Sequence, residues 1–135
     1  MTQPPTLHPP TLFVCALCKF PPTEAEGETA SGGQYLIDQL TDQLEGTVTL
    51  QPVRCMAACD RACNAALSAP GKLTFILNDL SPRQSAPDLA EFCRQYAAAE
   101  TGKVPYGLRS AAIKQATAYV LPPLVSESAA AAIAP

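Results

Sequence analysis

Four of the six cysteines stand in two close pairs, the residue pattern in this sequence best suited to chemistry. Cys15 and Cys18 are separated by two residues, 36 residues follow, and then Cys55 and Cys59 are separated by three. Four thiolates are the ligand set of a 2Fe-2S or 4Fe-4S cluster, and a tetrahedral zinc ion accepts the same set. A single close pair would be a weak signal, whereas two pairs in one short chain are fairly specific for metal. The spacing therefore predicts one metal centre held by these four thiols.

The composition indicates the compartment in which those thiols work. Residues 1–10, MTQPPTLHPP, carry neither the basic nor the apolar region of an export signal, so we expect a cytoplasmic protein. In a reducing compartment, cysteines more often bind metal or do redox chemistry than form a disulfide framework. The net charge is -3, the pI is near 5.0, no Lys or Arg run occurs and the apolar runs are short. These features argue against nucleic-acid and membrane partners.

Two predicted strands deliver the cysteine pairs. Residues 11–15, TLFVC, form a short run of apolar and β-forming residues that ends at Cys15. Residues 47–54, TVTLQPVR, predict a second strand that ends just before Cys55, and Pro52 within it favours an edge strand or a bulge. Because neighbouring strands place their end loops at the same edge of a sheet, we expect the two pairs to converge there.

Two helices are expected to pack on this sheet. Residues 34–44 have apolar side chains at helical spacing, with Ser31 upstream as a candidate cap. A second helix is expected to begin at Ser85, because Asp88 follows three residues later and Pro87 lies in the first turn.

The remaining elements are a hairpin and a C-terminal extension. Residues 64–68 and 72–77 flank an Ala-Pro-Gly turn and predict two antiparallel strands. A third, shorter helix is expected within residues 108–120, before Pro122. Its expected inward residues are Ile113, Thr117 and Val120.

The order of these elements predicts an α/β fold, β-α-β-β-β-α with a short C-terminal extension. A length of 135 residues suits one domain, which we expect to span residues 11–125. Residues 1–10 are rich in proline and residues 126–135 are of low complexity, so both are expected to be flexible tails.

The cysteine segments resemble known proteins. The order strand, Cys pair, helix, strand, then CMAAC and a hairpin resembles the thioredoxin-like 2Fe-2S ferredoxins, which include the small ferredoxin-like subunit of bacterial respiratory complex I. The segments VCALC, RCMAACDRACNAAL and GKLTFILNDLSP are similar to a family of small uncharacterised proteins described as predicted metal-binding. Some members of that family are encoded near cobalamin-biosynthesis genes. The resemblance covers about residues 12–96.

The resemblance implies a thioredoxin-like ferredoxin fold and a 2Fe-2S cluster as cofactor. It implies that Cys15, Cys18, Cys55 and Cys59 are the cluster ligands, and that the chain passes single electrons to a redox partner protein of unknown identity. A link to cobalamin or other tetrapyrrole metabolism is implied only by the position of some family members near cobalamin-biosynthesis genes. A homodimer is left open as an assembly.

Two other functions compete with the iron-sulfur prediction. The same four thiols form a common structural zinc site, in a zinc or metal-handling protein without redox activity. A CxxC pair after a strand is also typical of thiol-disulfide oxidoreductases, in which a helix N-terminus lowers the pKa of a thiol. The proline-containing loop after Cys18 argues against such a helix. We find no Ser/His/Asp set or nucleotide loop, so we expect an electron carrier or metal-binding protein and not an enzyme.

Three further residues have expected roles of their own. Cys63 follows Cys59 by four residues, so it could replace a ligand, pack as a small hydrophobe, or donate a weak hydrogen bond to a ligand sulfur. We favour the last role. Arg61, with Asp60, is expected to shape the surroundings of the ligands or to dock a partner, and an exposed ion pair in a turn is the equally favoured alternative. Cys93 lies on the apolar side of the second helix and is expected to be a buried structural thiol.

Overall fold

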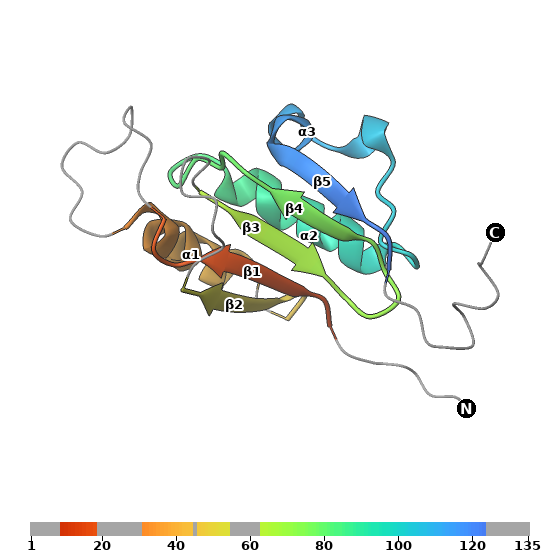
Figure 1. Ribbon diagram of the computed structural model, residues 1–135, viewed down its shortest axis with the longest axis horizontal. Helices are drawn as coiled ribbons and strands as arrows, with labels where there is room; N and C mark the ends of the chain where they lie inside the picture. Colours follow the sequence, from red (N-terminus) through yellow and green to blue (C-terminus); the bar gives the residue numbers. More distant parts are fainter. Residues whose placement is uncertain (1–8, 19–30, 45, 55–62, 124–135) are drawn as a thin grey trace.

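The computed structural model describes residues 9–18, 31–44, 46–54 and 63–123, and Figure 1 shows how their elements are arranged. The strands are β1 (Thr11–Cys15), β2 (Thr49–Val53), β3 (Ala65–Ser68), β4 (Thr74–Leu77) and β5 (Thr117–Leu121). The helices are α1 (Gly32–Gln43), α2 (Ala86–Ala98), the 3-10 helix η3 (Tyr106–Leu108) and α3 (Ala111–Ala116). The two predicted strands before the hairpin, the hairpin and the first two helices are thereby confirmed.

The five strands form one mixed sheet in the order β2-β1-β3-β4-β5. β1 runs parallel to β2, and each of the other neighbouring pairs is antiparallel. β2 lies at an edge of the sheet, as predicted from Pro52, which has no N–H to donate to a second neighbour. Because β1 and β2 are parallel, both strands end at the same edge of the sheet.

One face of the sheet is covered by α1 and α2, which lie next to each other in Figure 1 and contact each other. Alternate strand residues point into the core beneath them, as the period of two along a strand requires. The fully buried strand residues are Leu12, Val14, Ala65, Leu67, Phe75 and Leu77. The Phe75 ring meets the rings of Phe92 and Tyr96 on α2 edge-on, at centroid distances of 4.9 and 6.0 Å.

The starts of the two main helices follow the sequence prediction with one difference. Ser31 caps α1, since its hydroxyl accepts a hydrogen bond from the N–H of Gln34 at 3.0 Å. Ser85 precedes α2, but its hydroxyl accepts from the N–H of Ser81 at 2.8 Å and makes no cap within the helix. Ser85 therefore fixes the loop before α2 and not the helix itself.

The C-terminal extension differs from the prediction. The expected helix within residues 108–120 ends at Ala116, and β5 then pairs with β4 along its outer edge. Ile113 is buried as predicted, but Val120 is 42% exposed. The segment TAYVL contains β-branched and aromatic residues, which suit a strand, and β4 offers the hydrogen-bonding edge. The predicted order thus lacked a fifth strand.

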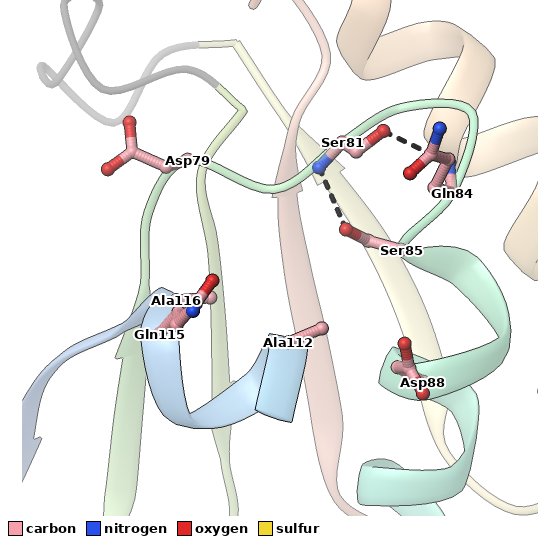
Figure 2. Close-up of a pocket in the computed structure, with 8 residues that line it drawn as sticks. All are labelled: Asp79, Ser81, Gln84, Ser85, Asp88, Ala112, Gln115 and Ala116. Atoms are coloured by element: carbon pink, nitrogen blue, oxygen red, sulfur yellow. Dashed lines mark hydrogen bonds between the residues drawn. The ribbon is translucent and has the colours of Figure 1, made fainter. Parts of the chain in front are cut away.

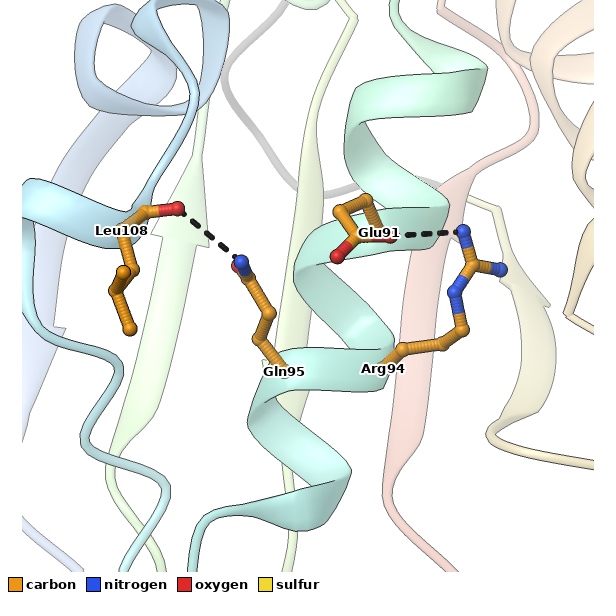
Figure 3. Close-up of polar contacts among 4 residues, drawn as sticks. All are labelled: Glu91, Arg94, Gln95 and Leu108. Atoms are coloured by element: carbon orange, nitrogen blue, oxygen red, sulfur yellow. Dashed lines mark hydrogen bonds and ion pairs between the residues drawn. The ribbon is translucent and has the colours of Figure 1, made fainter.

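A polar contact joins this extension to α2, as Figure 3 shows. The side-chain amide of Gln95 donates to the carbonyl oxygen of Leu108 at 3.1 Å, which joins the end of η3 to the helix. Arg94 and Glu91 form an exposed ion pair on the same helix, one that contributes little stability. None of the helices in the described ranges is long and apolar enough to cross a membrane.

Candidate metal centre

The first cysteine pair lies at the edge of the sheet where β1, β2 and β3 come together. Cys15 is the last residue of β1 and pairs with Val53, the last residue of β2. Its N–H donates to the carbonyl oxygen of Asn64, just before β3, at 3.1 Å. The next N–H, that of Ala16, donates to the carbonyl oxygen of Val53 at 2.7 Å. The backbone at the start of the pair is therefore held from both sides.

The turn from Cys15 to Cys18 is joined to the N-terminus of α1. The Ser31 hydroxyl donates to the carbonyl oxygen of Ala16 at 2.6 Å, and the Gly33 N–H donates to that of Cys18 at 2.9 Å. A β-carbon at Gly33 would overlap the carbonyl oxygen of Cys15 and lie 3.0 Å from its carbonyl carbon. Glycine is therefore required where the helix meets the turn.

This contact corrects the argument that no helix N-terminus lies at the pair. The proline-containing loop does prevent a helix directly after Cys18, but the chain returns and places the first turn of α1 against the pair. The N-terminus of a helix carries a partial positive charge, which favours negative charge nearby. The residues that follow the pair immediately do not reveal this helix, because α1 begins only at Gly32.

Cys63 brings a third thiol to Cys18. Its N–H donates to the carbonyl oxygen of Leu80 at 3.2 Å, and its own carbonyl accepts from the Leu80 N–H at 3.0 Å. Its side chain is fully buried and hydrogen-bonds to the Cys18 side chain, which also hydrogen-bonds to Cys15. Cys18 therefore lies at the centre of three buried thiols, Cys15, Cys18 and Cys63, which we call the thiol cluster.

The neighbours of Cys18 favour its thiolate form. The pKa of the Cys18 thiol falls from 9.0 to about 6, chiefly because of the hydrogen bond from the Cys63 side chain. Burial acts in the opposite direction, while hydrogen bonds from Cys15 and from the backbone and side chain of Asn64 lower the pKa further. The thiolate is the form of cysteine that binds metal and attacks disulfides. The cluster is thus suited to either chemistry.

The second predicted pair lies outside the described residues, and so does Arg61. The chain leading to that pair passes close to Cys15, whose thiol donates to the carbonyl oxygen of Arg54 at 3.9 Å. In the described ranges, no three Cys, His, Asp or Glu side chains are arranged to hold a metal ion. The thiol cluster is joined by hydrogen bonds through Cys18.

Cys93 belongs to the core, as predicted. It is fully buried on α2 between residues that pack against the sheet. Burial raises the pKa of its thiol to about 12, partly offset by the charge of Arg94. The neutral thiol packs as a small hydrophobe and is unsuited to binding a metal.

A polar groove of about 420 Å³ lies between α2, α3 and the loop that precedes α2. Figure 2 shows Asp79, on that loop, well separated from Asp88 on α2. The lining contains no cysteine, and the two carboxylates come from different elements. Nothing in this groove matches the predicted chemistry, so the thiol cluster is the candidate site.

Sequence reasoning missed two residues that contact the first pair. Gly33 is one of two adjacent glycines at the start of a helix, a pattern that signals close approach of the backbone but does not name the partner. Asn64 follows Cys63 and carries no recognisable signal in the sequence. Both contacts join segments far apart in the chain and become visible only in the fold.

The mixed sheet with two helices across one face places the protein among the thioredoxin-like ferredoxin folds. It is similar to a structure described as a thioredoxin-like 2Fe-2S ferredoxin from Aquifex aeolicus, with a TM-score of 0.52 and 15% identity. The similarity covers 89% of this chain and 100% of the other. A second structure of the wild-type ferredoxin from that organism gives a TM-score of 0.49 and 16% identity, over 82% and 97% of the two chains.

Residues 12–123 match a family described as "Protein of unknown function (DUF1636)", and the chain belongs to that family. No curated protein matches the sequence. Likeness to the ferredoxins at this level of identity shows the fold alone. The cluster and its four ligands therefore stay predictions.

Proposed function

We propose that the chain is a small one-electron carrier that holds a 2Fe-2S cluster through Cys15, Cys18, Cys55 and Cys59. The observation that carries the proposal is the thiol cluster at the sheet edge where β1 and β2 end together. The first pair is the end of β1, and the second pair follows β2 directly in the sequence. Both predicted pairs are thus attached to neighbouring strand ends.

The donor chemistry of the described residues fits such a group. Thiolates are soft ligands, and the hydrogen bonds around Cys18 favour the thiolate at neutral pH. When bound, a 2Fe-2S cluster supplies one-electron reduction and reoxidation. The protein holds the first pair in a fixed turn through Gly33 and keeps both of its thiols buried from solvent. We assign the direct iron contacts of this turn to Cys15 and Cys18.

Cys63 is proposed to donate a weak hydrogen bond to the Cys18 sulfur and not to bind iron itself. Its contact with Cys18 and its complete burial support a place beside the ligands. Arg61 is proposed to lie beside the second pair. A donor to a ligand sulfur tunes the reduction potential without changing the number of ligands.

Iron analysis of protein made anaerobically in iron-replete cells tests the ligand assignment. Cys15→Ser and Cys59→Ser should each abolish iron binding, because each removes one of four ligands, whereas Cys93→Ser should keep the iron and visible colour of the unaltered chain. A colourless, zinc-loaded product would favour the zinc alternative, which uses the same thiols. Loss of iron only in Cys93→Ser would overturn the assignment of core and site.

A thiol-disulfide oxidoreductase is a second candidate, favoured by one specific observation. The pKa of Cys18 is lowered to about 6 and the N-terminus of α1 meets the CxxC turn, as in a reactive pair. In that function Cys15 and Cys18 would give two electrons and two protons to a partner disulfide and form a disulfide themselves. Reduction of a protein disulfide by the metal-free chain, lost in Cys18→Ser, would support it. If Cys15 and Cys18 both stay reduced in the presence of a disulfide substrate, this function is excluded.

The physiological context of the carrier is part of the proposal and rests on the sequence resemblance. We place it in the cytoplasm, with a redox partner protein and a role connected to cobalamin or other tetrapyrrole metabolism. Copurification of the partner under reducing conditions, identified by mass spectrometry, tests this. A partner from unrelated metabolism would remove the tetrapyrrole link and leave the electron-carrier proposal standing.

A further inference from the structure

Asn64 is a polar residue buried beside the first cysteine pair. It lies between Cys63 and β3, and only 1% of its surface is exposed. Its carbonyl oxygen accepts the N–H of Cys15 at 3.1 Å, while its side-chain Nδ2 lies 3.6 Å from the Cys18 sulfur. The backbone N–H of Asn64 also donates to that sulfur. One residue therefore contacts both members of the pair.

The side-chain contact suits a charged sulfur better than a neutral thiol. An N–H donor stabilises negative charge on sulfur, and a metal-bound or free thiolate carries such charge. Burying an amide costs free energy unless it is hydrogen-bonded, and an apolar residue would fill this place without that cost. The position of the amide is therefore best explained by the sulfur that it contacts.

We infer that Asn64 is a positioning residue, whose side-chain N–H orients the Cys18 sulfur for metal binding and stabilises the negative charge it carries. The effect on reduction potential rests on the proposed function. The reduced form of a 2Fe-2S centre is the more negative one, so a donor to a ligand sulfur raises the potential. The effect on metal affinity holds for any metal bound through Cys18.

Asn78 provides a matched control for substitution at Asn64. It is also a buried asparagine, 9% exposed, and it follows β4 at the same end of the sheet. Its N–H donates to the carbonyl oxygen of Ala116, so its backbone contact is with the C-terminal extension. Asn78→Leu therefore applies the same chemical change beside the site without removing a donor to Cys18.

Two measurements on the full chain test the inference. The metal-free protein is titrated with Co²⁺, a probe metal for thiolates. The dissociation constant should be larger by about tenfold or more for Asn64→Leu than for the unaltered chain, because supporting hydrogen bonds contribute at that level. Asn78→Leu should stay close to the unaltered chain. In cluster-loaded protein, the midpoint potential of Asn64→Leu should be more negative than that of Asn78→Leu.

Equal Co²⁺ affinities in the two leucine variants would overturn the inference. A chain that acquires no iron-sulfur cluster would defeat the proposed function, while the Co²⁺ titration would still decide the role of Asn64. Should Asn64→Leu fail to fold, Asn64→Ala and Asn78→Ala give the same comparison with a smaller side chain.

Discussion

The N–H of Gly33 donates to the carbonyl oxygen of Cys18 at 2.9 Å, so the first turn of α1 closes over the turn that carries the first cysteine pair. The close approach depends on the missing β-carbon, since one at Gly33 would overlap the carbonyl oxygen of Cys15. Together with the bond from the Ser31 hydroxyl to the Ala16 carbonyl oxygen, this contact fixes the turn of the pair against the start of the helix.

Gly33→Ala is expected to lower the free energy of unfolding of the metal-free chain by about 1–3 kcal/mol, the usual cost of overpacking. It should also lower the iron content, because the turn has to move away from the helix. Denaturant unfolding and iron analysis measure both effects. Gly107→Ala is the control, since a β-carbon there meets nothing within 4 Å. Equal stabilities of the two variants would show that the contact at Gly33 is unimportant.

Cys63→Ala is expected to keep the full iron content and to lower the reduction potential. The reason is that Cys63 donates a hydrogen bond to the Cys18 sulfur and is not itself a proposed ligand. Iron analysis and a redox titration check the two parts separately. Loss of iron in Cys63→Ala together with retention in Cys18→Ala would show that Cys63 is the ligand in place of Cys18.

The thiol of Cys18 should make the stability of the metal-free chain depend on pH. Its pKa is lowered in the folded state, from 9.0 to about 6. A depressed pKa contributes stability that is complete above about pH 9 and is lost as the pH falls through about 6. Urea unfolding across this range, under reducing conditions, should show a steeper loss of stability toward low pH than in Cys18→Ala. Parallel curves for the two chains would contradict the lowered pKa.

Cys93→Ser is expected to lower the free energy of unfolding by about 1–3 kcal/mol, because it buries a hydroxyl in place of an apolar thiol. Cys93→Ala tests the same position without a polar group and should cost less if the hydroxyl causes the loss. Thermal or denaturant unfolding measures the difference. A serine variant as stable as the unaltered chain would mean that Cys93 is not packed in the core as its burial indicates.

The sequence was informative where a local pattern was sufficient. The apolar run that ends at Cys15 predicts β1, and Pro52 predicts that β2 lies at an edge, because each depends on a few neighbouring residues. β5 was missed since residues 108–120 also show helical spacing. Only the sheet order reveals the edge of β4 that Thr117–Leu121 can pair with.

The contacts of the site were harder to predict than its residue types. Spacing alone selects the cysteine pairs, and it indicates that Cys63 lies near them. It does not reveal that Asn64 donates to Cys18, or that a helix separated from the pair by a long loop returns to it. Such contacts depend on tertiary packing, which no periodic pattern in the sequence records.

Electron paramagnetic resonance of the chemically reduced chain, prepared anaerobically from iron-replete cells, tests the central claim most directly. The account predicts a brown-red protein with about one cluster per chain and a reduced state that integrates to about one unpaired electron, as a one-electron 2Fe-2S centre requires. A colourless protein that contains zinc, gives no signal after reduction and stays folded through the same thiols would contradict it.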